Sequence, residues 1–265
     1  MPSLIGQKAL QIINRKLLFC YVCGNILEKG NAQNRDHVPP SACIAQGDKA
    51  HSPLILPTHS DCNASFKKDD ERVGQFLSIL HEKVAKDENR RLEYKQFSNS
   101  SLARQGIQSQ AVTNVNMYGV VERWIRAFHA ALYMQPLPLN TRFAIELPFD
   151  VISPVDDAYI TDSGRPRQRT LCEETIASNR LTKTIDRLAA WNGNLKYECV
   201  WALTPLHAYC VFFLDFYNWG RLARLTGKKP MDCVGIYELS LTDLPTQATV
   251  ESKIITAKRS YKFGL

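Results

Sequence analysis

The chain has 265 residues, of which 45% are hydrophobic and 22% charged, an ordinary composition for a soluble globular protein with one large or two ordinary domains. No apolar signal segment follows Met1 and no run approaches the length of a membrane span. We therefore expect a cytoplasmic protein without membrane contact, whose eight cysteines stay reduced. The net charge of +7 and the pI near 9.0 suit a polyanionic partner such as nucleic acid, because lysines and arginines release counterions from phosphates.

The first part of the chain predicts several short elements followed by one long helix. They are an amphipathic helix at 3–14, strands at 17–22, 35–38 and 54–56, and a helix that begins at Ser60. Pro39 and Pro40 end the second strand, because neither can donate a ladder hydrogen bond. In the last helix the apolar side chains from Phe66 to Val84 fall on one face, with charged residues largely opposite.

The second part of the chain predicts an α+β domain. The charged stretch 86–95 and the polar run 98–101 indicate a linker, so we expect domains at 1–95 and 112–265. The elements expected after this boundary are helices at 114–135 and 171–190, a loop at 151–170, and strands at 141–147, 195–203, 208–216 and 233–241. This order of elements favours a mainly antiparallel sheet.

Two Cys/His pairs bracket the stretch of the chain that carries most of its chemistry. Cys20 and Cys23 form the first pair, and His59 and Cys62 form the second, each with a spacing of three residues. Three thiolates and one imidazole suit a tetrahedral structural zinc ion that would pin two distant loops together. Cys43 competes with His59 for the fourth position, although His59-Ser-Asp-Cys62 has the better spacing.

Three polar residues next to these pairs suit phosphodiester hydrolysis. Asp36 and His37 stand in the sequence Arg-Asp-His-Val-Pro-Pro, and Asn63 directly follows the second pair. A histidine can take the proton from water, and the carboxylate of Asp36 with the amide oxygen of Asn63 suits Mg²⁺ or Mn²⁺ better than zinc. Adjacent strand residues point to opposite faces, however. Asp36 and His37 share one site only if the backbone twists or bulges, or if the metal lies at the strand edge near the helix start.

In this order, the residues from Cys20 to about Asp70 resemble the HNH (ββα-metal) endonuclease family, in its zinc-knuckle type with an Asp-His-Val-Pro-Pro motif. The resemblance is confined to this part of the chain. It implies an N-terminal ββα-metal HNH module with the structural zinc, in which Asp36 and Asn63 bind a catalytic Mg²⁺ or Mn²⁺ and His37 is the general base. It also implies an endonuclease that hydrolyses phosphodiester bonds in nucleic acid, with DNA as the expected substrate.

One position departs from the family pattern. Family members usually carry a central Asn or His on the second strand, which braces the loop that holds the base, and Leu54 stands in its place here. His51 or Ser52 could substitute from a shifted register. Two other functions therefore stay open. One is a zinc-stabilised module that binds nucleic acid without cleaving it, and the other is a protein-interaction module in which the nuclease-like fold is only a scaffold.

Basic side chains outside the motif are candidate contacts for nucleic acid, and each can equally be a solvated charge. They are Arg35 and Lys67 beside the site, and Arg165, Arg167 and Arg169 in the expected loop at 151–170. We expect the C-terminal domain to choose the target or to bind a protein partner. The other histidines, the tryptophans and the remaining cysteines are expected to be structural: His81, His129, His207, Trp124, Trp191, Trp201, Trp219, Cys43, Cys172, Cys199, Cys210 and Cys233.

Overall fold

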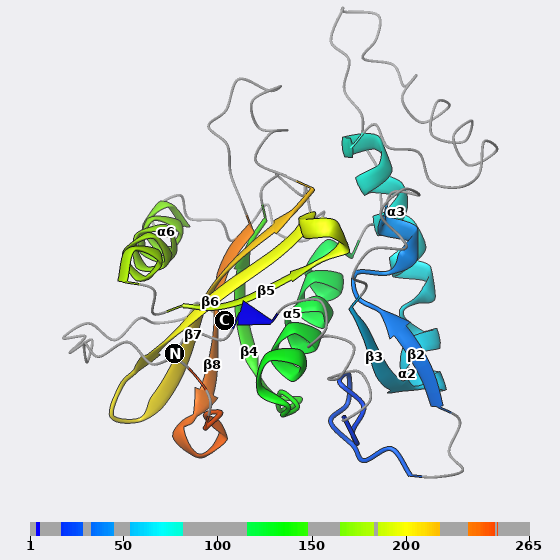
Figure 1. The fold of residues 1–265 in the computed structure, drawn as a ribbon, viewed down its shortest axis with the longest axis horizontal. Coiled ribbons are helices and arrows are strands. Elements are labelled where there is room, and N and C mark those ends of the chain that lie inside the picture. Colours follow the sequence, from blue (N-terminus) through cyan, green and yellow to red (C-terminus); the bar gives the residue numbers. More distant parts are fainter. Residues whose placement is uncertain are drawn as a thin grey trace, which may run out of the picture.

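The fold mixes helices with a mainly antiparallel sheet, as predicted for the C-terminal part (Figure 1). The computed structural model describes residues 4–5, 17–28, 33–44, 54–81, 116–147, 165–182, 185–217, 233–246 and 248. The predicted linker and the boundary at 95–112 lie outside these residues, as do His51 and Ser52. Within the described residues, no helix is both long and apolar enough to cross a membrane.

A six-stranded sheet forms the centre of the structure, with the strand order β1-β5-β6-β7-β8-β4. Its strands are β1 (Leu4–Ile5), β4 (Arg142–Glu146), β5 (Asp186–Ala190), β6 (Leu195–Leu203), β7 (His207–Phe216) and β8 (Cys233–Ser240). All neighbouring strands are antiparallel except β1 and β5. The strands predicted at 141–147, 195–203, 208–216 and 233–241 are confirmed.

Two helices cover opposite faces of this sheet, α5 (Met117–Tyr133) and α6 (Arg165–Thr182) (Figure 1). Strand alternation decides which side chain meets which helix. On β6, Cys199 and Trp201 belong to the hydrophobic cluster that includes α5. Val200 between them belongs to the second cluster, with Cys172 and Ile176 of α6. Because both faces of the sheet are covered, its central strands are apolar on both sides.

Helix α5 is buried almost all round, since 14 of its 17 residues are buried. The sequence predicts this helix and its apolar face correctly, but not the second layer that covers its other side. Asn116 caps its start by accepting a hydrogen bond from the Gly119 amide (3.1 Å). Met134 ends it in the left-handed conformation (φ 56°) and donates its amide to the Ala130 carbonyl (3.0 Å).

The second layer on α5 consists of N-terminal elements (Figure 1). They are β2 (Gln33–His37), a 3₁₀ turn η1 (Ser41–Cys43), β3 (Ile55–His59), α2 (Ser60–Ser65) and α3 (Lys67–His81). The helix predicted from Ser60 is confirmed, interrupted only at Phe66. Leu54, Leu56 and Val73 from this layer join α5 in one hydrophobic cluster that also includes the sheet. This cluster joins the parts of the chain on either side of the predicted boundary.

Strands β2 and β3 form a separate antiparallel pair, which confirms two of the predicted strands with shifted ends. Arg35 faces Pro57, and the Val38 amide donates to the Leu54 carbonyl (2.9 Å). Hydrogen-bonded and non-bonded pairs alternate along such a ladder, so the 35–57 pair is a non-bonded one. At a non-bonded position the backbone N–H points away from the partner strand, so Pro57, which has no N–H, removes no hydrogen bond between β2 and β3. Strand β3 therefore continues through Pro57 to His59.

Two N-terminal predictions are wrong for the described residues. Leu4–Ile5 form β1, which pairs in parallel with Arg187–Leu188 of β5, instead of the start of a helix. The open edge of β5 supplies backbone partners that no local pattern reveals. Residues 17–20 do not form a strand: Phe19 makes a single antiparallel bridge to Ile26, and a turn follows at 21–23.

The predicted boundaries around α6 are also wrong. The helix begins at Arg165, inside the predicted loop at 151–170, and ends at Thr182; residues 151–164 lie outside the described part of the chain. The last five residues of the helix predicted at 171–190 form the strand β5, which is hydrogen-bonded to β6 on one side and to β1 on the other. Helix propensity is a weak preference that such long-range pairing overrides.

A network of buried polar side chains joins α5 to the sheet. The Tyr133 hydroxyl donates to Asp186 Oδ2 (2.9 Å) and accepts from Trp201 Nε1 (2.9 Å). His129 Nδ1 lies 3.0 Å from the Tyr237 hydroxyl. Burial, reinforced by the positive charge of Arg126, lowers the pKa of His129 from 6.5 to about 3. His129 is therefore a structural residue, as expected, and it is neutral in the folded protein.

We expect this histidine to make the protein sensitive to acid. As the pH falls below 6.5, the unfolded chain protonates at His129 before the folded one, so the stability that the neutral ring contributes is lost progressively down to about pH 3. Two pH units below 6.5 the loss reaches about 2.7 kcal/mol. The free energy of unfolding in urea, compared at pH 7 and pH 4.5, measures this loss of stability. His129→Gln should reduce this pH dependence. An unchanged pH dependence in His129→Gln would contradict the expectation.

Candidate functional site

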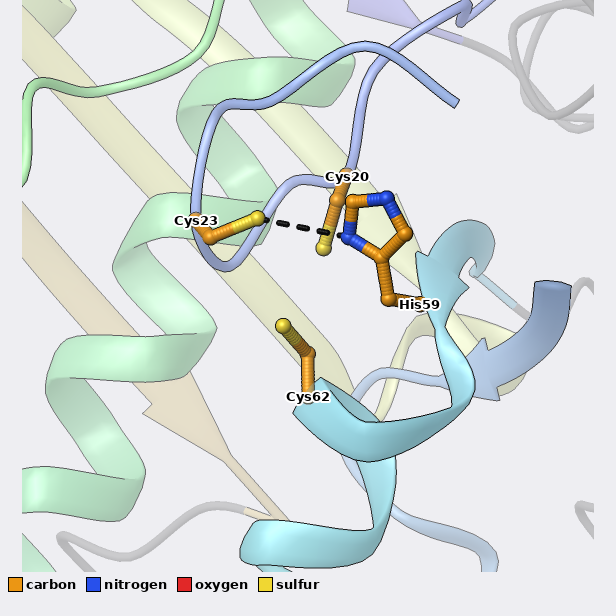
Figure 2. Close-up of side chains that lie close together, drawn as sticks. All are labelled: Cys20, Cys23, His59 and Cys62. Atoms are coloured by element: carbon orange, nitrogen blue, oxygen red, sulfur yellow. Dashed lines mark hydrogen bonds between the residues drawn. The ribbon is translucent and has the colours of Figure 1, made fainter. Parts of the chain in front are cut away.

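The first half of the site is a tight turn that carries Cys20 and Cys23. The Gly24 amide donates to the Cys20 carbonyl (2.8 Å), and the Cys20 amide donates to the Asn25 carbonyl (2.9 Å). Gly24 has φ 77°, a left-handed conformation that L side chains rarely adopt, so a glycine is favoured at this position. The turn directs both thiols toward the same region (Figure 2).

The second half lies where β3 passes into α2. His59 is the last residue of the strand and Cys62 the third residue of the helix, so the strand-to-helix turn brings their side chains together. Thr58, which is fully buried, connects the two halves, because its hydroxyl lies 3.2 Å from Cys20 Sγ. When Cys20 is a thiolate, Thr58 is the donor in this contact.

The four side chains form one cluster that can hold a metal ion (Figure 2). The ligand atoms of Cys20, Cys23, His59 and Cys62 all lie within 4.8 Å of one another, and Cys23 Sγ is 3.4 Å from His59 Nδ1. Ligand atoms on one tetrahedral zinc ion are about 3.5–3.8 Å apart, so these residues need only small movements to bind one. Cys43, the competing ligand, is a buried residue of η1 and is not in the cluster.

Electrostatics also favour a cation at this cluster. Burial raises the pKa of the Cys20 thiol by itself, but hydrogen bonds from Thr58 and from the backbone of Cys23, His59 and Val22 outweigh it and lower the pKa to about 7. Burial and the neighbouring charges of Cys20 and Cys23 raise the pKa of Cys62 to about 12. A second thiolate is thus unfavourable next to the first, and a bound divalent cation removes this cost.

Asp36 points into the protein interior and is 6% exposed. The Tyr21 hydroxyl donates a hydrogen bond to Asp36 Oδ2. Arg123 of α5 donates to Asp70 Oδ1 (2.5 Å) in the same group of buried charges, and interacts electrostatically with Asp36. Burial raises the pKa of Asp70 to about 6, although Arg123 lowers it. The observed role of Asp36 is to help hold the turn and β2 together, next to α5.

His37 lies on the other side of β2. The β2–β3 register continues without a bulge through both residues, so Asp36 and His37 point to opposite faces. The His37 ring contacts Trp191, with ring centroids 5.9 Å apart and planes inclined by 36°. The structure therefore brings the four Cys/His residues together but does not bring Asp36 and His37 to one face.

The other candidate residues are placed as follows. Asn63 is a half-buried residue of α2, and its backbone carbonyl accepts from the Phe66 amide (3.3 Å). Arg35 is exposed and shares the outer face of β2 with His37, and Lys67 is exposed at the start of α3. The three arginines that are candidate nucleic-acid contacts, Arg165, Arg167 and Arg169, lie in the first turns of α6 and not in a loop.

Sequence reasoning missed three residues that hold the site together. Tyr21 is buried and lies between the two cysteines of the turn, and an aromatic residue at this position is a signal that the sequence contains. Arg123 and Trp191 come from the second half of the chain, and no spacing links them to the motif. They are connected to it by contacts across the fold, Arg123 with Asp70 and Trp191 with the end of β2.

Comparisons with known proteins give no match on which to base a function. No protein-family model, curated protein sequence or solved structure matches the chain.

Proposed function

We propose that the protein is an HNH-type endonuclease that hydrolyses phosphodiester bonds in DNA, with a structural zinc ion on Cys20, Cys23, His59 and Cys62. The observation that carries the proposal is the Cys/His cluster itself. It fixes the turn at 20–25 against the junction of β3 and α2. That junction lies between the strand paired with the Asp-His motif and the helix that contains Asn63.

His37 is the proposed general base. It is half-buried on the outer face of β2, beside the exposed Arg35, where a phosphate can approach and find a positive charge. The family resemblance adds Mg²⁺ or Mn²⁺ on Asp36 and Asn63, which would neutralise charge on the phosphate. Asp36 does not fit this role in the observed arrangement, because it is buried and bonded to Tyr21. Binding the ion would require Asp36 to leave that partner.

The position of Asp36 favours a second candidate function. A zinc-stabilised module that binds nucleic acid or protein without cleaving anything needs the Cys/His cluster but no catalytic carboxylate. In that case Asp36 is an anchor for Tyr21, and the Asp-His-Val-Pro-Pro sequence serves only the fold.

Nicking of supercoiled plasmid DNA separates the two functions. The purified protein is incubated with plasmid, with Mg²⁺ or Mn²⁺ or with EDTA, and binding is followed in parallel by fluorescence anisotropy. An endonuclease gives ion-dependent nicked and linear products. Binding without any product, for DNA and RNA and for both ions, supports the non-catalytic module.

The basic start of α6 is expected to contribute to nucleic-acid binding. Replacing Arg165, Arg167 and Arg169 together by Gln should weaken binding and flatten its salt dependence, because each lost phosphate contact reduces the magnitude of the negative slope of log K against log salt by about 0.9. Arg142→Gln, at an exposed arginine of β4, is the control. A triple variant with the wild-type slope would show that these arginines are ordinary solvated charges.

A further inference from the structure

Val38, the residue that follows His37, is hydrogen-bonded through both its amide and its carbonyl. The Val38 amide donates to the Leu54 carbonyl (2.9 Å), and the Val38 carbonyl accepts from Trp191 Nε1 (3.0 Å). Both Val38 and Trp191 are completely buried. Leu54 thus provides the backbone acceptor for the Val38 amide. The side-chain donor to the Val38 carbonyl is Trp191, which is 153 positions away in the sequence.

Trp191 lies at a hydrogen-bonded corner of the large sheet. It begins the 3₁₀ turn η4 (Trp191–Gly193), which connects β5 to β6, and it has φ 53°. A non-glycine residue in this region of φ is strained and persists only where its surroundings fix it. The Trp191 carbonyl accepts from both the backbone and the side-chain nitrogen of Asn194 (3.0 Å each), and the Asn194 carbonyl accepts from the Tyr217 amide (2.6 Å).

The same indole also contacts the proposed base. The rings of His37 and Trp191 are 5.9 Å apart between centroids and inclined by 36°. One side chain therefore fixes the backbone just after His37 and limits the positions of the His37 ring. A tryptophan that merely fills the core does not need both contacts at the end of a strand from another layer.

We infer that Trp191 is a positioning residue, which holds the end of β2 and the His37 ring and so makes the large sheet a part of the active site. Its effect on catalysis rests on the proposed function, whereas its effect on β2 does not. A displaced general base loses reaction rate without a comparable loss of substrate binding, because binding uses other groups. The expected signature is a lower kcat with an unchanged KM.

Trp191→Phe tests this inference, with Trp201→Phe as the matched control. Trp201 is also fully buried and also donates one hydrogen bond, to Tyr133, but it lies on β6 inside the sheet. We expect Trp191→Phe to accelerate hydrogen exchange at the Val38 amide by about tenfold or more relative to the amides of β6. Its plasmid-nicking kcat should fall roughly 10- to 100-fold with KM unchanged. Trp201→Phe should do neither.

The exchange measurement does not depend on nuclease activity, so the two proposals can fail separately. If Val38 exchanges at the wild-type rate in Trp191→Phe, the inference is overturned. If the wild-type protein cleaves nothing, the proposed function fails and exchange at Val38 still decides whether Trp191 holds β2. Should Trp191→Phe not fold, a benzothienyl-alanine at position 191 keeps the shape of the indole and removes only its N–H. Unchanged exchange in that variant would equally overturn the inference.

Discussion

Removal of zinc is expected to unfold the N-terminal layer of the structure. The backbone hydrogen bonds of the turn at 20–25 stay within residues 18–27, so among the described residues the Cys/His cluster is its main link to β3 and α2. Structural zinc sites contribute about 10–16 kcal/mol of apparent binding energy at neutral pH, which becomes folding energy when no site exists in the unfolded chain. We expect strong chelation, or Cys23→Ser, to abolish hydrogen-exchange protection in β2 and β3.

Cys43→Ala is the matched control for this experiment. Cys43 is a buried cysteine of the same layer, but it lies outside the cluster, so the variant should keep its zinc and its protection. Metal content is measured by mass spectrometry on the same samples. Well-folded wild-type protein without zinc would show that the cluster is not a zinc site.

His37→Ala is expected to reduce the cleavage rate by roughly 10²–10⁴-fold, the usual contribution of a general base. Zinc content and fold should survive, because His37 is neither in the Cys/His cluster nor completely buried. Single-turnover plasmid nicking at saturating protein measures the rate. His207→Ala, at a part-exposed histidine of β7, is the control and should cleave at the wild-type rate. Wild-type cleavage by a clean His37→Ala preparation would exclude His37 as the base.

Asn63→Ala is expected to differ from His37→Ala in its response to magnesium. If the amide oxygen of Asn63 binds the ion, its loss weakens ion binding, and a higher Mg²⁺ concentration should partly restore cleavage. A missing general base cannot be replaced in this way. A magnesium titration of both variants checks the difference. Failure of magnesium to restore Asn63→Ala would argue that Asn63 has only a structural role in α2.

The sequence alone determined the features that depend on local spacing. Two Cys/His pairs with three-residue spacing were sufficient to predict the cluster of Cys20, Cys23, His59 and Cys62. Helix α5 and strands β6, β7 and β8 were predictable because their apolar side chains recur with the helical or strand period, and the end of α5 is marked by Pro136 and Pro138.

Tertiary structure alone decided the features that depend on distant partners. Asp186–Ala190 form a strand because β6 pairs with all five residues, and Leu4–Ile5 form a strand because β5 offers them its other edge; this pairing overrides the local preference for helix. Asp36 is buried because Tyr21 binds it and α5 places Arg123 in the same group of charges. Trp191 is hydrogen-bonded to Val38, which is 153 positions away in the sequence. The packing of the layers determines this contact, and no sequence motif predicts it.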